Sequence, residues 1–395
     1  MAGPLEGIKV LSFGRVLAGP FAAMLFADLG AEVIKIEDPK KGDIGRINGP
    51  FIKDLSSYFL SVNRGKKSLS LNLRHEKAKE IIKNLIPKVD ILLENFRPGI
   101  MKKMGLEYET AKGVNPRLIY VSISGFGQSG PYTSKPAFDM VAQAAGGTVS
   151  ITGEPGRPPV RVGFSIGDIG ASLFAVNATL AALYEREHSG QGQYIDVAMV
   201  DSQIALCENA YARHFATGEI PEPFGTRHPL VTTFQIFPTK TDAMVLIAYR
   251  DEEWEKLCKA IGREDLTEDK RFKEGANRHK NHAILEPILI EIFKSKTRDE
   301  WFSIFEEAGL IHGPVNNIKQ VVNDPHTSAR EMVLEVDHSR LGKLKVVGTP
   351  MKFSRTPCKI EKASPDLGEY TEEILTTELN LSMDEIEKLK KEGVI

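Results

Sequence analysis

Short apolar runs alternate with helical patterns through the first two hundred residues. Ile8–Phe13 has the composition of a buried strand, a helix is predicted from Pro20 to Leu29, and Gly30 ends it before a strand at Glu32–Ile36. Further strands are predicted at residues 68–73, 90–94, 118–124 and 194–199, and helices at 75–86 and 170–188. Repeated strand–helix–strand units predict a parallel sheet covered by helices, so the expected fold class is α/β.

The pattern changes over residues 216–230. This segment includes Ala216–His228, which holds two prolines and two glycines among polar residues and is typical of a linker. Beyond it, Thr233–Phe237 and Met244–Ala248 have the pattern of a hairpin, and amphipathic helices are predicted at 252–261, 283–293 and 298–308. Residues 231–330 are therefore expected to form a second, smaller α+β domain. Two domains also fit a length of 395 residues.

Composition narrows the partners and the compartment. The chain is 42% hydrophobic and 26% charged, which is typical of a soluble globular protein. Its net charge of −2 shows no basic excess of the kind that nucleic-acid binding usually requires. The N-terminus lacks the pattern of a signal peptide, and no stretch approaches the ~20 apolar residues of a membrane span, so no membrane partner is expected. Three scattered cysteines fit a reducing cytoplasm, and of the histidines only His279 and His282 lie close together, so no metal site is predicted.

Three turns carry candidate chemistry. The segment from Gly125 to Gly130 matches the dinucleotide pattern G-x-G-x-x-G, but Pro131 and a turn-rich stretch replace the helix that would hold a pyrophosphate, so a structural loop is favoured. Ala18-Gly19-Pro20 opens a helix after the first strand with residues small enough for a ligand to approach the backbone, or is simply a tight turn. Asn95-Phe-Arg-Pro-Gly99 follows a strand and has donors and nearby lysines suited to phosphates, or is a solvated loop.

Asp168 precedes the longest apolar helix, in the segment VGFSIGDIGAS. Aspartate fills the N-cap position of a helix well, and from its chemistry alone this is the simplest role. The flanking sequence is apolar and rich in glycine, however, so a substrate can approach the carboxylate closely. A carboxylate in a site with little water can act as a covalent nucleophile toward an activated acyl group.

An ordered series of motifs spans nearly the whole chain: LEGIKVLSF, LAGPFAAMLFADLGAEVIKIE, KGDIGR, NRGKKSLSLNL, ENFRPG, NPRLIYVSISGFGQSGP, FDMVAQAAGG, TGEPGRPPVRVGFSIGDIGASLFAVNATLAALYERE and SGQGQYIDVAMVDS. With this series the chain resembles the class III CoA-transferases, which include formyl-CoA transferase and carnitine CoA-transferase, with α-methylacyl-CoA racemase as a relative. The resemblance implies an interlocked dimer. Each subunit would have a large doubly wound, Rossmann-like domain over residues 1–215, completed by 331–395, and the smaller domain inserted between.

The resemblance also assigns roles to residues of this chain. It implies that Asp168 is the nucleophile, with acyl-CoA as substrate and no permanently bound cofactor. Asp168 would attack the thioester to give an anhydride, free CoA would form an aspartyl-CoA thioester, and an incoming carboxylic acid would reverse the steps. Residues expected to bind CoA or line its cleft are Leu17, Ala18, Leu71, Asn72, Leu73, Arg74, Asn95, Phe96, Arg97, Lys103, Lys135 and Asp139.

Water must be excluded from such intermediates, and the glycine spacing suggests the N–H groups of Gly167, Ile169 and Gly170 as oxyanion donors. The chain departs from formyl-CoA transferase in its first loop, where histidine and glutamine are replaced by Arg15 and Leu17. A family arginine is replaced by Asp38, and the small domain has no counterpart of the glycine-rich flap. A larger or more apolar acid is therefore expected, with Arg15 or Arg46 able to hold a second carboxylate.

Other functions remain open at this point. A racemase of this family would have a histidine where this chain has Phe138, which cannot transfer a proton, so an epimerase is disfavoured. A non-catalytic acyl-CoA-binding subunit of a hetero-oligomer is a second alternative, and an NAD-dependent dehydrogenase is a third. The transferase, as a cytoplasmic homodimer acting on an acyl-CoA donor and a free acid, is the preferred prediction.

Overall fold

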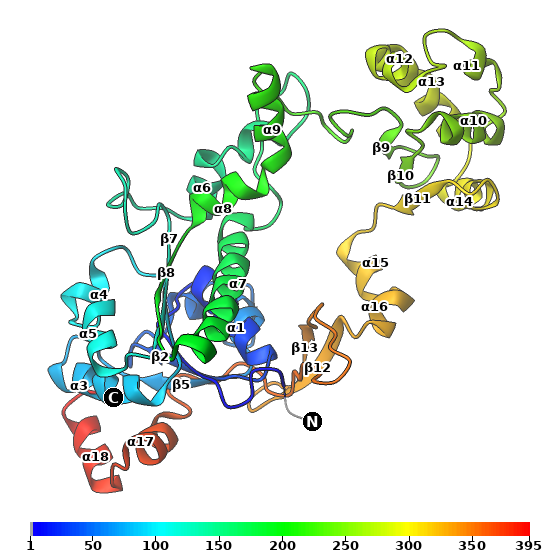
Figure 1. Ribbon diagram of the computed structural model, residues 1–395. Coiled ribbons are helices and arrows are strands. Elements are labelled where there is room, and N and C mark those ends of the chain that lie inside the picture. The colour runs from blue at the N-terminus through cyan, green and yellow to red at the C-terminus, as the bar shows by residue number, and fades with distance from the viewer. Residues whose placement is uncertain (1–2) are drawn as a thin grey trace. The chain divides into compact units, whose positions relative to one another are not determined.

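A computed structural model describes residues 3–395 of the chain, which divides into two compact units (Figure 1). The first unit comprises the chain up to Val149, Arg161–Glu219 and Pro325–Ile395. The second comprises Ser150–Val160 and Ile220–Asp324. The first unit holds every residue predicted for the site, so it is described in more detail.

Six parallel strands form the central sheet of the first unit, in the order β5-β2-β1-β6-β7-β8. The predicted parallel sheet is thus confirmed. The sheet grows in one direction from β1 to β2 and β5, and in the other from β6 to β7 and β8. The strand order therefore reverses between β1 and β6, and the loops after these two strands lead in opposite directions. Open α/β sheets place their ligands in the crevice at such a point. The strands are β1 Lys9–Ser12, β2 Glu32–Glu37, β5 Lys66–Ser70, β6 Ile91–Glu94, β7 Ile119–Ser124 and β8 Tyr194–Ala198.

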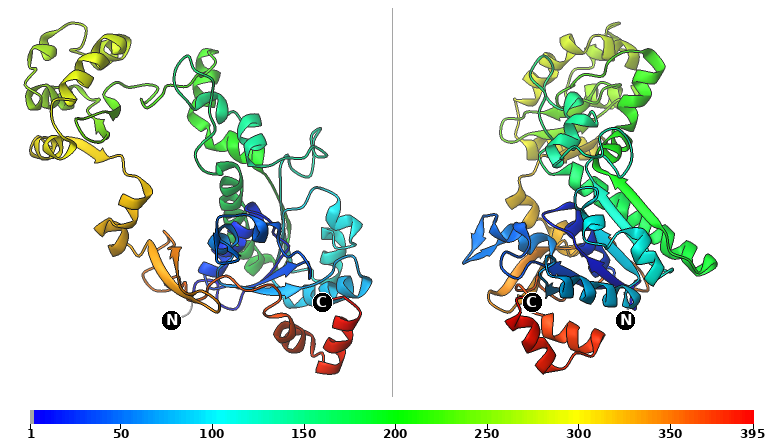
Figure 2. Two further views of the ribbon diagram at one scale, coloured as in Figure 1. Left: turned by 180° about the vertical axis from the view of Figure 1, so that it is seen from behind. Right: turned by 90° about the vertical axis from the view of Figure 1, so that its left-hand side faces the viewer.

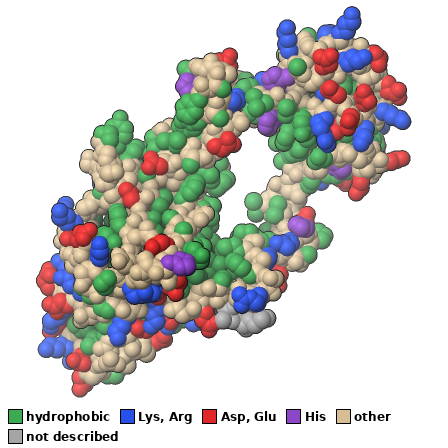
Figure 3. Space-filling view, in the orientation of Figure 1, with side chains coloured by type: hydrophobic (Ala, Val, Ile, Leu, Met, Phe, Trp, Pro, Cys, Tyr) green, Lys and Arg blue, Asp and Glu red, His purple; other side chains and the backbone are tan. Residues whose placement is uncertain are grey.

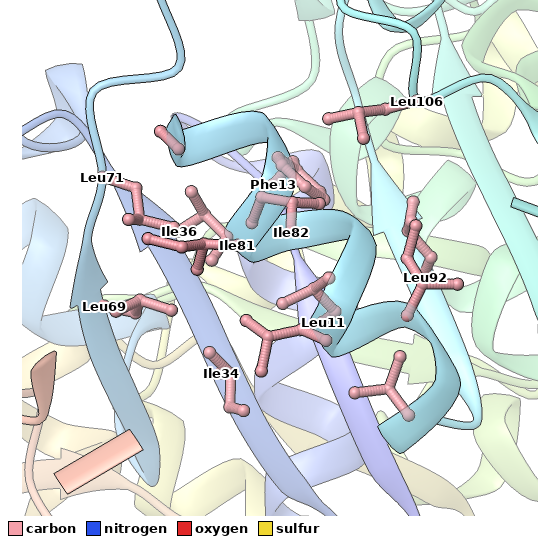
Figure 4. Close-up of a cluster of buried hydrophobic side chains, with 14 of the residues drawn as sticks. Leu11, Phe13, Ile34, Ile36, Leu69, Leu71, Ile81, Ile82, Leu92 and Leu106 are labelled. Carbon is pink, nitrogen blue, oxygen red and sulfur yellow. The ribbon is translucent and has the colours of Figure 1, made fainter. Parts of the chain in front are cut away.

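Helices cover both faces of this sheet (Figure 2). Because side chains alternate along a strand, Leu11 and Ile34 point to one face while Val10 and Val33 point to the other. The first face packs against α3 (Glu76–Leu85), α5 (Tyr108–Val114), α17 (Thr371–Leu379) and α18 (Met383–Lys391), and Figure 4 shows Ile81 and Ile82 of α3 over Leu11, Ile34 and Leu69. The second face packs against α1 (Ala18–Asp28), α6 (Asp139–Ala145), α7 (Ile166–Ser189) and α8 (Met199–Leu206).

The helix α7 begins four residues before its predicted start at Gly170. Ser165 occupies the N-cap position, so Asp168 lies in the first helical turn and is not the N-cap. The sequence also predicted that no segment is long and apolar enough to span a membrane. That prediction was wrong by length and composition alone, because α7 meets both criteria. Half of its most apolar window is buried in the fold, and its residues Ala171, Ala175 and Val176 belong to the core beneath the sheet.

The second unit contains an antiparallel sheet in the order β11-β10-β9. The predicted hairpin is confirmed, since β9 (Phe234–Phe237) pairs with β10 (Met244–Ile247), and β11 (Ile311–Pro314) adds a third strand. Its helices surround a core that contains Trp254 and Trp301. They are α10 Asp251–Ala260, α11 Asp265–Glu268, α12 Gly275–Lys280, α13 His282–Phe293 and α14 Arg298–Glu307.

The remaining elements are short. They are β3 Phe51–Ile52, β4 Leu55–Ser56, α2 Ser57–Val62, α4 Ile100–Lys103, α9 Glu208–Thr217, α15 Ile318–Val322, α16 Pro325–Ala329, β12 Val333–His338 and β13 Gly342–Val347.

Candidate active site

Asp168 stands in the first turn of α7, half-buried and with no hydrogen-bond partner for its carboxyl group among residues 3–395. Glycines on both sides allow neighbouring groups to pack closely around it. A Cβ atom on Gly167 would lie 2.9 Å from Asp139 Oδ1, and one on Gly170 would lie 2.8 Å from Leu206 Cδ1. Burial, and then the nearby negative charge of Asp139, raise the pKa of Asp168 to about 7.

Asp139, the first residue of α6, is fixed beside the nucleophile candidate by two hydrogen bonds. Its Oδ1 accepts from the Gly167 N–H at 2.8 Å and its Oδ2 accepts from Gln143 Nε2 at 2.8 Å. Arg161 Nη2 is 4.0 Å from Oδ2. Asp139 is therefore a carboxylate whose hydrogen bonds are made within the fold, whereas Asp168 has none.

Two of the three predicted oxyanion donors at the start of α7, the amides of Gly167 and Ile169, are already engaged. The Gly167 N–H donates to Asp139, and the Ile169 N–H donates to the Ser165 carbonyl at 3.0 Å. The expectation that these two amides face a substrate oxygen was therefore wrong. The first amides of α1, those of Ala18 and Gly19, have no acceptor within their own helix, because the first turn of any helix lacks one.

The turn that opens α1 meets the first turn of α7. Ser172 Oγ lies 2.7 Å from the carbonyl oxygens of both Ala18 and Asp168. Leu17 and Ala18 of this turn are buried, at 8% and 2% exposed. The structure thus brings the predicted CoA-contacting turn and the predicted nucleophile together, from positions 150 residues apart in the sequence.

A buried ion pair holds this turn in a strained conformation. Val16 has a φ of 64°, which a β-branched residue rarely adopts. Its N–H donates to Asp43 Oδ1 at 3.0 Å, while Lys35 Nζ donates to Asp43 Oδ2 at 2.7 Å and to the Gly14 carbonyl at 2.6 Å. Burial alone would raise the pKa of Asp43, but the charge of Lys35 and the N–H groups of Gly45 and Val16 outweigh it and hold that pKa below its usual range.

Asn95 joins the loops that follow β1 and β6. Its Oδ1 accepts from the Arg15 N–H at 2.8 Å and its Nδ2 donates to the Arg15 carbonyl at 3.0 Å. A Cβ atom on Gly19 would lie 2.8 Å from Asn95 Oδ1, so glycine is required there. The half-buried Phe96 follows, and the Arg15 guanidinium lies 4.9 Å from the centre of its ring. The side chain of Asn95 therefore shapes the site through the backbone of Arg15.

The loop after β5 is anchored to the C-terminal segment. Leu71 is fully buried in the core, and Leu73 packs against that core. Asn72 donates from its N–H to the Val394 carbonyl at 2.8 Å and from Nδ2 to the Gly393 carbonyl at 3.1 Å. Of the four residues predicted here, only Arg74 presents an exposed charged side chain.

Five exposed cations of this region make no ion pair with any residue in the range 3–395: Arg15, Arg74, Arg97, Lys103 and Lys135. Arg74 and Arg15 both act on Asp38 after β2. Burial raises its pKa, but the N–H groups of Lys40 and Lys41 and then these two charges together outweigh burial and lower that pKa. Lys135 Nζ rests 3.6 Å from the centre of the Tyr132 ring. Four of these cations follow the carboxyl ends of β1, β5 and β6, and Lys135 lies in the segment after β7. Unpaired cations suit a ligand with several phosphates.

Arg46 is not available for a second carboxylate, contrary to expectation. It makes a bidentate ion pair with the buried Glu37, at 2.8 Å from Nε and 2.7 Å from Nη2, and its guanidinium lies 3.7 Å from the centre of the Phe59 ring. Arg15 is the remaining candidate of the two.

Tyr58 of α2 belongs to this site, and the sequence prediction missed it. Burial, and then the charges of Asp168, Asp43 and Asp139, raise its pKa to about 12. The phenol therefore stays protonated at neutral pH and is a hydrogen-bond donor in the field of the three aspartates. No periodicity or motif distinguishes it, because it lies on a six-residue helix that only the fold brings near α7.

The first unit therefore has an unpaired, partly desolvated carboxyl group at the start of α7, and exposed cations without ion-pair partners on the loops after its strands. Among residues 3–395, no group of three or more His, Cys, Asp or Glu side chains is arranged to hold a metal ion. This set of groups can attack a carbonyl carbon and bind a long phosphorylated ligand with its own side chains.

Comparison with known proteins identifies the family. The model of CoA-transferase family III matches residues 5–371, and the chain belongs to this family. Succinyl-CoA:glutarate CoA-transferase of Mus musculus is 36% identical over 99% of this chain and 90% of its own length. Succinyl-CoA–D-citramalate CoA-transferase of Chloroflexus aurantiacus is 37% identical, over 99% of this chain and 98% of its own length. A CAIB/BAIF family protein from Brucella suis has a similar structure, with a TM-score of 0.87 and 34% identity over 96% of this chain and all of that chain.

The protein is therefore an enzyme that transfers CoA between an acyl-CoA and a carboxylic acid. The prediction of a class III CoA-transferase is confirmed at this level.

Proposed function

We propose that Asp168 carries the transfer through two kinds of covalent intermediate. Its carboxylate attacks the thioester carbonyl, forming an aspartyl–acyl anhydride and releasing CoA thiolate. The thiolate attacks the aspartyl carbonyl, which gives an aspartyl-CoA thioester and frees the first acid. The second acid attacks this thioester and expels the thiolate, which then attacks the acyl carbonyl of the new anhydride and restores the Asp168 carboxylate.

The observation that carries this proposal is the state of the Asp168 carboxyl group. Its oxygens are committed to no partner, so a lone pair can reach an electrophile without breaking a hydrogen bond. Partial burial removes water that would weaken the nucleophile and hydrolyse an anhydride. The raised pKa means that about half of the groups are ionised at pH 7.

Charge develops on the thioester and anhydride oxygens during each step. The N–H groups of Ala18 and Gly19 are the proposed donors, because Ser172 joins the α1 turn to the α7 turn that carries Asp168. The protonated phenol of Tyr58 is a third donor in the field of the same carboxylate. We assign oxyanion stabilisation to these three groups.

The CoA moiety is assigned to the loops after β1, β5 and β6 and to the segment after β7 that carries Lys135. Arg74, Arg97, Lys103 and Lys135 supply charges for its phosphates, while Asn72 and Asn95 hold the loops in place. The backbone around Leu17, Leu71 and Leu73 and the ring of Phe96 would contact its uncharged parts. Asp139 positions the start of α7 next to the reacting thioester.

We further propose that the acids are dicarboxylates, with Arg15 binding the carboxylate remote from the reaction. Arg15 is exposed and has no ion-pair partner in the described chain. The names of several relatives specify glutarate, D-citramalate and mesaconate as acids. Replacing Arg15 by glutamine should raise KM about 10- to 100-fold for glutarate and change it little for butyrate, because one charge-assisted hydrogen bond is lost.

We propose that the working form is a cytoplasmic homodimer. Hydrophobic side chains remain exposed along one side of α7, which is otherwise a core helix: Leu173 is 52% exposed, Leu180 37% and Tyr184 70%. Figure 3 shows hydrophobic surface around α7 and α8, where charged side chains are few. A second copy covering this stripe would remove it from water, and the chain-link dimer implied by the family resemblance supplies such a copy.

The experiment that tests the activity uses a panel of acyl-CoA donors and free acids, with mass spectrometry of new CoA esters. Wild-type protein should form glutaryl-CoA from succinyl-CoA and glutarate, while Asp168→Ala should bind CoA without exchange. An active alanine variant would refute the assignment of Asp168. Reversible acyl-CoA binding by wild-type protein, without any exchange, would instead support a binding subunit.

A further inference from the structure

A cavity lies in the first unit, beside the carboxyl ends of β6 and β7. It has a volume of about 330 Å³ and is lined by β6, β7, the start of β8 and the segment that carries α4 and α5. Arg97 is the only residue that it shares with the predicted CoA contacts. The proposed transferase function uses Arg97 and leaves the other lining residues without a role.

Three tyrosines form one wall of the cavity. The ring centres of Tyr108 and Tyr194 are 5.3 Å apart, those of Tyr120 and Tyr194 are 5.7 Å apart, and those of Tyr108 and Tyr120 are 6.0 Å apart. Tyr120 is fixed by its hydroxyl, which donates to the Leu106 carbonyl at 2.9 Å. Aromatic faces attract organic cations, and this wall is held rigidly enough to do so.

Carboxyl groups lie beside this aromatic wall. Glu94 ends β6 and is only 4% exposed; its Oε2 accepts from the Phe96 N–H at 2.7 Å. Glu107 lines the same cavity, and its Oε2 has no hydrogen-bond partner in the described chain. The amide nitrogen of Gln128, also buried at the wall, has none either. Leaving such groups unpaired costs free energy, and both are ends of flexible side chains that a ligand can draw toward itself.

The cavity also has exposed cations. Arg97 and Lys102 line it and make no ion pair with any residue between 3 and 395. The exposed Glu109 is the remaining charged residue of the lining. The lining therefore offers carboxylates beside aromatic rings for a cation, and separate exposed cations for an anion.

We propose that this cavity binds a small zwitterionic amine of the amino-acid class. Its ammonium group is held by Glu94 and Glu107 against the tyrosine wall, and its carboxylate by Arg97 and Lys102. A metal ion is a poorer match, because the acidic side chains are too few and too dispersed to form a coordinating group among residues 3–395. The binding uses none of the groups assigned to the covalent chemistry at Asp168, and it shares only Arg97 with the proposed CoA contacts.

Binding of a cation has a consequence for Glu94. The pKa of this carboxyl is raised to about 7: burial raises it, hydrogen bonds from Ser122 and the Phe96 N–H lower it, and the charge of Asp196 on β8 raises it further. Glu107 and Glu109 add negative charge from the α5 side, while Arg97 and Lys102 add positive charge from the α4 side. An ammonium group beside Glu94 favours its ionised form, so binding releases a proton and strengthens as the pH rises through 7.

The test is calorimetric titration of the full-length protein with γ-aminobutyrate at pH 7, in two buffers that differ in ionisation enthalpy. Saturable binding should release roughly half a proton per ligand, since a group with a pKa near 7 is half protonated there. Propylamine should bind more weakly, and butyrate should release no proton. Glu94→Gln should abolish the proton release and weaken binding about 10-fold.

Asp168→Asn separates this site from the transfer site, because a ligand near Asp168 would also release a proton there. The proposal requires binding and proton release to be unchanged in Asp168→Asn. The proposal is overturned if Asp168→Asn no longer releases protons on binding, or if Glu94→Gln binds and releases protons as the wild type does. It is also overturned if γ-aminobutyrate does not bind at concentrations up to ~10 mM, which would detect even a weak ligand. If Glu94→Gln does not fold, Glu107→Gln on the α5 side must weaken binding instead, and unchanged affinity overturns the proposal.

Discussion

Two aspartates of the same unit show how surroundings assign a role. Asp43 is almost completely buried and is bonded by Lys35 and by the N–H groups of Val16 and Gly45, so its pKa is lowered. Asp168 is less buried but has no bonded partner, so its pKa is raised to about 7. The first side chain stabilises the folded turn, whereas the second retains the reactivity of an unpaired carboxylate.

The difference teaches that burial alone does not mark a nucleophile. Hydrogen bonds and an opposite charge make Asp43 a stable anion with its lone pairs occupied. At Asp168, partial burial and the like charge of Asp139 both raise the free energy of the ionised carboxylate, which raises its pKa. Substitutions at the two positions should therefore have opposite effects on stability.

The largest effect is expected for Asp168→Asn. Without a carboxylate no anhydride forms, so the exchange rate should fall at least about 10⁴-fold, as for removal of a covalent nucleophile. Steady-state exchange and CoA binding, measured on the same preparation, check this. Asp201→Asn, in α8, is the matched control and should retain its activity. Near-normal exchange by Asp168→Asn, after exclusion of deamidation by mass spectrometry, would contradict the account.

Asp43→Asn should instead act on stability. It leaves the ammonium of Lys35 buried without its partner, which costs about 3 kcal/mol of unfolding free energy. The freed turn at Val16 should also lower kcat. Urea unfolding checks the first effect, and Asp54→Asn, an exposed aspartate paired with Arg340, is the control that should change nothing measurable. Equal stabilities of the two variants would show that the ion pair does not hold the turn.

The pH dependence of stability should differ in sign at the two sites. The folded state holds a proton on Asp168 more tightly than the unfolded state, so this group weakens the fold as the pH rises from about 4 to 7. Asp43 has a lowered pKa, and its contribution is lost as the pH falls through that value. The Tm of Asp168→Asn should therefore exceed the wild-type Tm by a few degrees at pH 8 and match it at pH 4, by scanning calorimetry. A variant less stable than wild type at pH 8 would contradict this sign.

A smaller effect is expected for Asp139→Asn. Its neutral oxygen can still accept the Gly167 N–H, but the negative charge that raises the pKa of Asp168 is gone. The rise of kcat/KM with pH should move to lower pH, with little loss at the plateau. Rate profiles between pH 5 and 9 check this. An unmoved profile would mean that burial alone sets the pKa of Asp168.

Much of the fold was predictable because local patterns determined it. The apolar runs of β1, β2, β6 and β7 and the turn residues between them indicate a parallel sheet, and its presence is confirmed. The start of α7 was placed too late because Gly167 and Gly170 obscured the helical pattern; both glycines are there for packing against Asp139 and Leu206. The chemistry of Asp168 alone indicated a helix N-cap, and only the family motifs indicated a nucleophile.

Other features of the site depend on contacts between distant segments, and no local pattern shows them. Tyr58 lies in the field of Asp168 only because folding brings α2 and α7 together. Arg46 cannot bind substrate because it is paired with Glu37 on β2. Similarly, the Gly167 N–H donates to Asp139 on α6, so it cannot serve as an oxyanion donor. The cavity near Glu94 also arises from three strands and two helices that the sequence separates widely.

The temporary covalent bond at Asp168 is tested most directly by following oxygen. Glutarate labelled with ¹⁸O in its carboxyl groups should be turned over with succinyl-CoA in unlabelled water, and the peptide containing Asp168 then analysed by mass spectrometry. Attack of the labelled acid on the aspartyl thioester, followed by release of its acyl group to CoA, leaves one labelled oxygen on Asp168 at each turnover. We predict this label in wild-type protein. Rapid exchange without label in that peptide would contradict an acylated Asp168.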